Sequence, residues 1–121
     1  MRLLVAEDET DIQFLYEAWF TREGFDVTIV PDGEAALSAV GTDHFDCIIL
    51  DVMMPKLDGL EVCRRIRQAG HSDVPIIIVS ALARPADVSA GMEAGADAYV
   101  DKPITPGTVV ARIREIVAGR A

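Results

Sequence analysis

Short runs of apolar residues recur along the chain, and each is too short to form a helix of ordinary length. Four are well defined, and a weaker fifth follows a Gly-Ala-Asp sequence. Because the runs are continuously apolar rather than alternating, they predict strands that are covered on both faces, as in a parallel sheet. The predicted strands are Leu3–Ala6, Val27–Val30, Cys47–Leu50, Ile76–Val79 and Ala98–Asp101.

Amphipathic segments that predict helices follow each of these runs. Thr10 and Gln13 have the spacing of a capping box, as do Asp58 and Glu61. Thr105 before Pro106 is a typical helix start. Strict alternation of strand and helix predicts an α/β fold with an open, doubly wound parallel sheet and right-handed crossovers. The predicted helices are Thr10–Glu23, Asp32–Val40, Asp58–Gly70, one from Pro85 to near Gly95, and one from Pro106 whose apolar face extends to Val117.

Length and composition fit one domain spanning residues 1–121, because half of the 121 residues are apolar and supply a core without disulfide or metal. Cys47 and Cys63 lie in apolar or helical stretches and are predicted to be buried, reduced thiols, which favours a cytoplasmic protein. We find no signal peptide and no apolar run long enough to span a membrane, so no membrane partner is expected. The last four residues are expected to be a frayed end or the start of a linker.

The formal net charge of −9 argues against direct nucleic-acid binding, because an acidic surface repels phosphate backbones. Ligands of doubly wound sheets bind beyond the carboxyl ends of the strands. Three carboxylates, one hydroxyl and one ammonium are predicted to meet there. They belong to Glu7, Asp8, Asp51, Ser80 and Lys102.

Three carboxylates in one cleft repel one another unless a cation lies between them. Mg²⁺ suits a site with few carboxylates, water and a phosphate, and the hydroxyl and ammonium suit phosphate oxygens. The set therefore indicates phosphoryl transfer to a carboxylate. Residues 7–9 alone would also suit the start of a helix, because carboxylates favour helix N-termini. The coincidence of polar residues at four strand ends favours the functional interpretation.

Several motifs in a fixed order span essentially the whole chain. They are Leu3–Glu9, Ile48–Pro55, Asp58–Gly59, Ile78–Ala81, Gly95–Val100 and Lys102–Pro103. On these motifs the chain closely resembles the receiver domains of two-component response regulators. The resemblance implies a flavodoxin-like sheet with strand order 2-1-3-4-5 and a signalling role without turnover of a separate substrate.

The resemblance implies a role for each matching acid. Asp51 is similar to the phosphorylated aspartate of the family. Glu7 and Asp8 are similar to the pair that holds Mg²⁺ together with Asp51, and the backbone carbonyl of Met53 is similar to a further ligand. Glu7 stands where the family more often has Asp, and its longer side chain is compatible with binding the metal through water.

The resemblance also implies a switch. Ser80 is similar to the hydroxyl that turns toward the phosphoryl group, and Tyr99 to the aromatic residue that changes rotamer with it. The face that would respond is formed by the fourth helix, the fifth strand and the fifth helix. Lys102 is similar to the residue that pairs with phosphoryl oxygens, and the Lys102–Pro103 bond to the family's cis peptide.

A second apolar cluster on the first helix predicts either a broad buried face or a docking surface. Phe14, Leu15 and Ala18 form this cluster at helical spacing. In the resembling family, the helices of a histidine kinase or phosphotransfer protein contact the first helix and the loop that here ends at Pro106. The signal, the cognate kinase, an output domain or effector, and the oligomeric state stay open.

Three other functions compete with this interpretation. A Mg²⁺-dependent small-molecule phosphatase with an Asp nucleophile would use similar residues, but it usually needs a second acid at the position of Met53. A flavodoxin-like or dinucleotide-binding module would need a phosphate-binding loop, and no G-x-G-x-x-G follows the first strand. A receiver that signals without phosphorylation would not need Asp51, Ser80 and Lys102 together.

Overall fold

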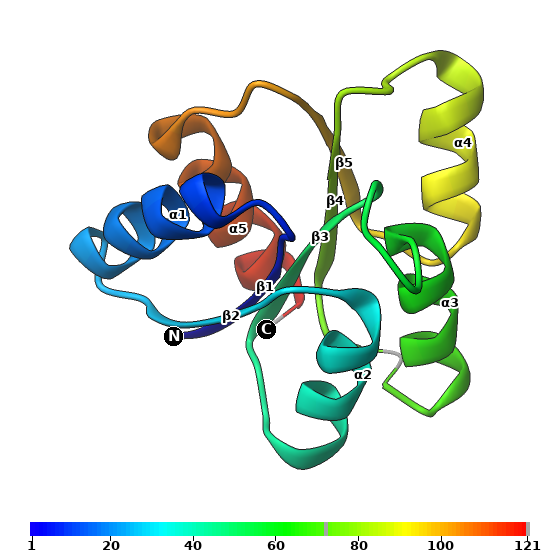
Figure 1. Cartoon of the computed structure of the whole chain (residues 1–121), viewed down its shortest axis with the longest axis horizontal. Coiled ribbons are helices and arrows are strands. Elements are labelled where there is room, and N and C mark those ends of the chain that lie inside the picture. The colour runs from blue at the N-terminus through cyan, green and yellow to red at the C-terminus, as the bar shows by residue number, and fades with distance from the viewer. Residues whose placement is uncertain (72, 121) are drawn as a thin grey trace.

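The computed structural model describes residues 1–71 and 73–120, apart from the side chain of residue 120. Within these residues, five parallel strands form one sheet in the order β2-β1-β3-β4-β5 (Figure 1). Each neighbouring pair of strands is parallel. The predicted fold class and strand order are therefore confirmed. The strands are β1 (Arg2–Ala6), β2 (Asp26–Val30), β3 (Cys47–Asp51), β4 (Ile76–Ser80) and β5 (Ala98–Asp101).

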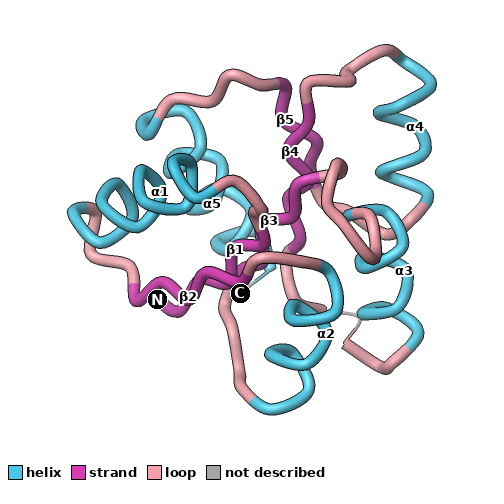
Figure 2. Tube along the Cα trace, in the orientation of Figure 1, coloured by secondary structure: helices cyan, strands magenta, loops and turns pink. Residues whose placement is uncertain are grey.

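Helices cover both faces of the sheet, as its continuously apolar strands require. Helices α1 and α5 lie on one side, whereas α2, α3 and α4 lie on the other (Figures 1 and 2). Each strand is followed by a helix, so the chain is the predicted series of β-α units. The helices are α1 (Thr10–Arg22), α2 (Gly33–Thr42), α3 (Gly59–Gln68), α4 (Pro85–Glu93) and α5 (Pro106–Arg120).

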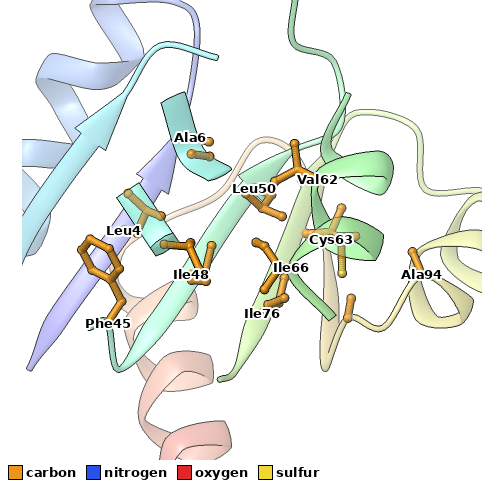
Figure 3. Packing of buried hydrophobic residues seen from close by; sticks show 14 residues of the cluster. Leu4, Ala6, Phe45, Ile48, Leu50, Val62, Cys63, Ile66, Ile76 and Ala94 are labelled. Atoms are coloured by element: carbon orange, nitrogen blue, oxygen red, sulfur yellow. The ribbon is translucent and has the colours of Figure 1, made fainter. Parts of the chain in front are cut away.

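The apolar side chains of each strand divide between two cores. Leu4 and Ala6 of β1 join the core beneath α2 and α3, where they meet residues such as Val62 and Ile66 (Figure 3). Leu3 and Val5 point into the second core, which is covered by larger side chains of α1 and α5. These include Tyr16, Phe20, Val109, Val110 and Ile113. Since successive strand residues face opposite sides, a doubly covered strand must be apolar throughout.

The helix starts confirm one predicted cap and correct another. The carboxylate of Asp58 accepts the N–H of Glu61 at 2.9 Å, as the capping spacing predicts. The Thr10–Gln13 capping box is wrong, because Glu9 is the N-cap of α1 and makes no side-chain cap bond. The Gln13 amide instead donates to the backbone carbonyl of Glu7 at 2.6 Å. The Gln13 side chain is thus bound to the loop before α1 and does not take part in the predicted capping box.

Element boundaries differ from the prediction by a few residues. Strands β3 and β4 each extend one residue further, to Asp51 and Ser80, because backbone pairing in a ladder does not depend on side-chain polarity. The expected fraying at the end is wrong for Ala118 and Gly119, since α5 continues to Arg120. Residue 121 lies outside the described residues.

Both cysteines are free and buried, as predicted. Burial raises the pKa of the Cys47 thiol to about 12 and that of the Cys63 thiol to about 11. Thiols held this far from ionisation are poor nucleophiles, so both act as small core residues. Across the described residues, every helix is too short or too polar to cross a bilayer.

Candidate functional site

Three carboxylates meet at the carboxyl edge of the sheet. Glu7 and Asp8 follow β1, and Asp51 is the last residue of β3, the neighbour of β1 in the sheet. One carboxylate oxygen from each residue lies within 4.8 Å of the others. Glu7 is 1% exposed and Asp51 6% exposed, whereas Asp8 is open to solvent. The structure thus brings together the acids that the sequence places at two separate strand ends.

Lys102, which follows β5, supplies a positive charge to this group. Its Nζ lies 2.5 Å from Oδ2 of Asp51 and 3.5 Å from Oε1 of Glu7. Burial by itself would lower the pKa of Lys102, but the hydrogen bond and the negative charge of Asp51 outweigh it and raise that pKa. Lys102 therefore stays charged at neutral pH. The Lys102–Pro103 peptide bond is cis.

Glu7 is the most perturbed acid of the site. Burial raises its pKa from 4.5 to about 7, and the negative charge of Asp51 adds to the rise. The backbone N–H of Glu9, which donates to Oε2 of Glu7 at 3.1 Å, and the charge of Lys102 act in the opposite direction. The charge of Lys102 thus does not compensate fully for the burial of Glu7 and the neighbouring charge of Asp51.

The donor atoms of this cluster suit a hard divalent cation. All three groups are carboxylates, and the cluster contains neither His nor Cys, the ligands that zinc sites favour. Asp8 is exposed and so leaves one side of the cluster open to water or to a phosphate. Few carboxylates combined with open positions are typical of Mg²⁺ sites. The residues present therefore fit the expected Mg²⁺.

The loop between β3 and α3 wraps closely around Asp51. The N–H of Met53 donates to Oδ1 of Asp51 at 3.0 Å, and the N–H of Gly59 donates to the carbonyl of Val52 at 3.0 Å. A Cβ on Gly59 would collide with the backbone carbonyl of Asp51, so the loop returns to the strand end at a distance that only glycine permits. The Met53 side chain is 63% exposed and lies outside the core.

Ser80 and Tyr99 meet through the backbone of Leu82. Ser80 is fully buried at the end of β4, and its Oγ accepts the N–H of Leu82 at 2.9 Å. The hydroxyl of Tyr99 donates to the carbonyl of Leu82. One residue of the β4–α4 loop is therefore bound from both sides by the two predicted switch residues.

The predicted docking cluster on α1 is open to solvent. Phe14 is 79% exposed and Leu15 40% exposed, and Ala18 is also exposed. Phe14 and Ala18 line a shallow groove of about 500 Å³ along α1. The alternative of a broad buried face is wrong, because the residues of α1 that are buried are Tyr16 and Phe20. Pro106, the first residue of α5, is half-buried.

Two features near the acids were not predicted. Gln13 fixes the backbone of Glu7, a role hidden by its capping-box spacing. Lys56 has a positive φ of 70°, which no residue type in the sequence signals. Another hollow, of about 560 Å³, lies at the opposite end of the sheet beside His44 and Pro75 and takes no part in this site.

A comparison with protein families matches residues 3–114 to the response regulator receiver domain. Among curated proteins, the chain is 43% identical over 116 residues to the probable transcriptional regulator ycf27 of Cyanophora paradoxa, and 45% identical over 115 residues to the transcriptional regulatory protein CseB of Streptomyces coelicolor. The alignments cover 96% and 95% of this chain but 48% of each relative. The chain therefore spans about half the length of these relatives.

Solved structures show the same fold. A receiver domain of the Francisella response regulator 1452 superposes with a TM-score of 0.93 at 31% identity, covering 99% of this chain and 98% of that one. The receiver domain of the Pseudomonas aeruginosa sensor histidine kinase PA1611, with a magnesium ion coordinated in its active-site cleft, superposes with a TM-score of 0.89 at 30% identity, covering 97% of each chain. This chain belongs to the response regulator receiver domain family, the phosphoacceptor signalling domains of two-component systems.

Proposed function

We propose that the chain is a Mg²⁺-dependent signalling switch that accepts a phosphoryl group on Asp51 from a histidine kinase or phosphotransfer protein. The observation that carries the proposal is the position of Asp51, buried at the end of β3 with Lys102 at 2.5 Å and two further carboxylates beside it. A buried carboxylate next to an ammonium and an acidic cation site is arranged to receive a phosphoryl group.

The chemistry follows from the groups around Asp51. An Asp51 oxygen would form a bond to phosphorus while the bond between phosphorus and the donor nitrogen breaks, and the electron pair leaves with the imidazole of the donor. Mg²⁺, held by Glu7, Asp8, Asp51 and the Met53 carbonyl, would neutralise charge on the transferred group. Lys102 would pair with the phosphoryl oxygens, and the Met53 N–H already orients Oδ1 of Asp51.

The same arrangement supports a switch through Leu82. If the Ser80 hydroxyl turned to a phosphoryl oxygen, its bond to the Leu82 N–H would be lost. The loop would then be free to move, and the Tyr99 hydroxyl bound to the Leu82 carbonyl would move with it. The face formed by α4, β5 and α5 would carry the change to a partner, because Tyr99 packs under Gly91 of α4.

Acetyl phosphate, which donates a phosphoryl group without a kinase, tests the assignment of the acceptor. With Mg²⁺, intact-mass spectra should show one added phosphoryl group on the wild type and on Asp101→Asn, an exposed acid at the same edge of the sheet. Asp51→Asn should show none. Equal labelling of Asp51→Asn would contradict the assignment, and turnover of p-nitrophenyl phosphate would favour a phosphatase instead.

We also propose that the exposed cluster on α1 docks the phosphoryl donor. Phe14, Leu15 and Ala18 leave apolar area exposed to solvent, and Pro106 begins the helix that neighbours α1. Phe14→Ala should slow transfer from the cognate kinase and leave labelling by acetyl phosphate unchanged. Slowing of both reactions by the same factor would assign the effect to the site and not to docking.

Matching relatives are named as transcriptional regulators of about twice this length, so we propose that an output domain or an effector protein reads the phosphorylated state. The formal charge of −9 supports an output that does not use this domain to bind DNA. The two free, buried thiols support a cytoplasmic location.

A further inference from the structure

The β3–α3 loop contains a turn that is unfavourable for the residue at its centre. The N–H of Leu57 donates to the carbonyl of Pro55 at 2.9 Å, which closes a three-residue turn around Lys56. Lys56 has φ of 70°, a region where glycine is free of strain and a side chain with a Cβ is not. Three-residue turns with a positive central φ are rare and strained. Some other interaction must therefore hold Lys56 in this conformation.

The Lys56 side chain reaches from this turn to the start of α2. Its Nζ lies 3.4 Å from Oδ2 of Asp32 and 4.0 Å from Oε2 of Glu34. The two carboxylate oxygens of Asp32 have different partners: Oδ2 faces Lys56, whereas Oδ1 accepts the N–H of Ala35 at 2.8 Å and so caps the helix. The Asp32 side chain is only 14% exposed, so the position of its carboxylate is fixed by the helix that it caps.

Backbone packing brings the same two segments together. A Cβ on Gly33, the first residue of α2, would lie 2.5 Å from the carbonyl oxygen of Leu57, so the loop rests directly on the helix start. At its other end the loop carries Met53, whose N–H is bound to Asp51. The turn is therefore joined by two residues of the same loop to the backbone of Met53, which is bound to Asp51.

We propose that Lys56 is a positioning residue for the cation site: its ion pair with Asp32 holds the strained turn against α2 and so helps to fix the backbone at Met53, whose carbonyl is the proposed further ligand. The inference rests on the proposed function, in which a divalent cation binds Glu7, Asp8 and Asp51. Lys56 is itself a cation, so its charge alone would oppose binding of a second cation. Removing the Lys56 charge should therefore weaken Mg²⁺ binding if Lys56 positions the site, and should strengthen it if Lys56 acts only through its charge.

The test measures Mg²⁺ affinity by NMR titration of backbone amides at low ionic strength. Lys56→Asn keeps a residue that tolerates positive φ but removes the charge, and Asp32→Asn keeps the helix cap but removes the other partner. Each should weaken Mg²⁺ binding about two- to fivefold, the range expected for losing one partly exposed ion pair. Lys56→Arg should restore most of the affinity. Arg112→Gln, which removes a cation from α5, is the control for net charge.

Further measurements separate positioning from a purely structural role. Lys56→Asn should unfold in urea at nearly the wild-type concentration, and the double variant with Asp32→Asn should bind Mg²⁺ no more weakly than either single variant. Unchanged or tighter Mg²⁺ binding by Lys56→Asn would overturn the inference while leaving the proposed function intact. A wild type that binds no Mg²⁺ would overturn both.

Discussion

Replacing Glu7 by Gln should stabilise the domain against unfolding at pH 8 when divalent cations are absent. Glu7 is 1% exposed, and burial raises its pKa from 4.5 to about 7. Above that pH the folded state must carry a charge that the unfolded chain carries in water at little cost. Gln has nearly the same shape, keeps an oxygen to accept the Glu9 N–H, and never ionises.

The magnitude follows from linkage between proton binding and folding. One unit of pKa is worth about 1.4 kcal/mol, so the full rise in the pKa of Glu7 corresponds to about 3 kcal/mol of lost unfolding free energy. Between pH 4.5 and 7 the folded state binds more protons than the unfolded state, so stability falls as pH rises. At pH 5 the penalty is about 1 kcal/mol, and above pH 7 it approaches its full size.

The assay is urea unfolding followed by circular dichroism in EDTA at several pH values from 5 to 8. The unfolding free energy of Glu7→Gln minus that of the wild type should increase by about 2 kcal/mol from pH 5 to pH 8. Glu17→Gln, at an exposed site on α1, is the matched control and should run parallel to the wild type. Parallel profiles for Glu7→Gln and the wild type would refute the reasoning, because they would mean that burial of Glu7 carries no charge penalty.

Two further substitutions test the packing around the site and the α4–β5 turn. Gly59→Ala should lower the unfolding free energy by about 2 kcal/mol and impair labelling by acetyl phosphate, because a Cβ at this position meets the carbonyl that ends β3. Gly41→Ala is the control and should not destabilise the domain, because the space around Gly41 is open. Arg67→Met should lower the unfolding free energy in urea by about 3 kcal/mol, because the Arg67 side chain is 16% exposed and its guanidinium donates to three backbone carbonyls and pairs with Asp97. A loss of less than about 1 kcal/mol, the effect expected for Arg64→Met at an exposed position, would contradict this.

The fold was predictable because its determinants are local and redundant. Strand β4, which is covered on both faces, is apolar from Ile76 to Val79 and is polar only at Ser80, where it meets the site. This continuous apolar run is shorter than an ordinary helix and therefore indicates a strand. Asp58, which caps α3 as predicted, shows the same agreement between local chemistry and the fold. The meeting of Glu7 with Asp51 was predictable because parallel strands end at one edge.

The features that could not be predicted from the sequence depend on contacts between segments. The spacing of Thr10 and Gln13 fits a capping box, but the carbonyl of Glu7 lay within reach and bound the Gln13 amide. The positive φ of Lys56 is invisible in a residue that is not a usual turn former, and its explanation requires the position of Asp32. Likewise, the spacing of Phe14 is compatible with burial or exposure, and only the packed helix decides between them.

We propose that the three converging acids hold a divalent cation beside the phosphoacceptor. NMR titration of the wild type with Mg²⁺ tests it most directly, with Asp8→Asn as the comparison because Asp8 is exposed and its loss should leave the fold intact. We predict saturable shifts confined to residues 7–9, 51–53 and 102 in the wild type, and binding at least tenfold weaker in the variant. Identical titrations for both proteins, or shifts that map to another part of the surface, would contradict the account.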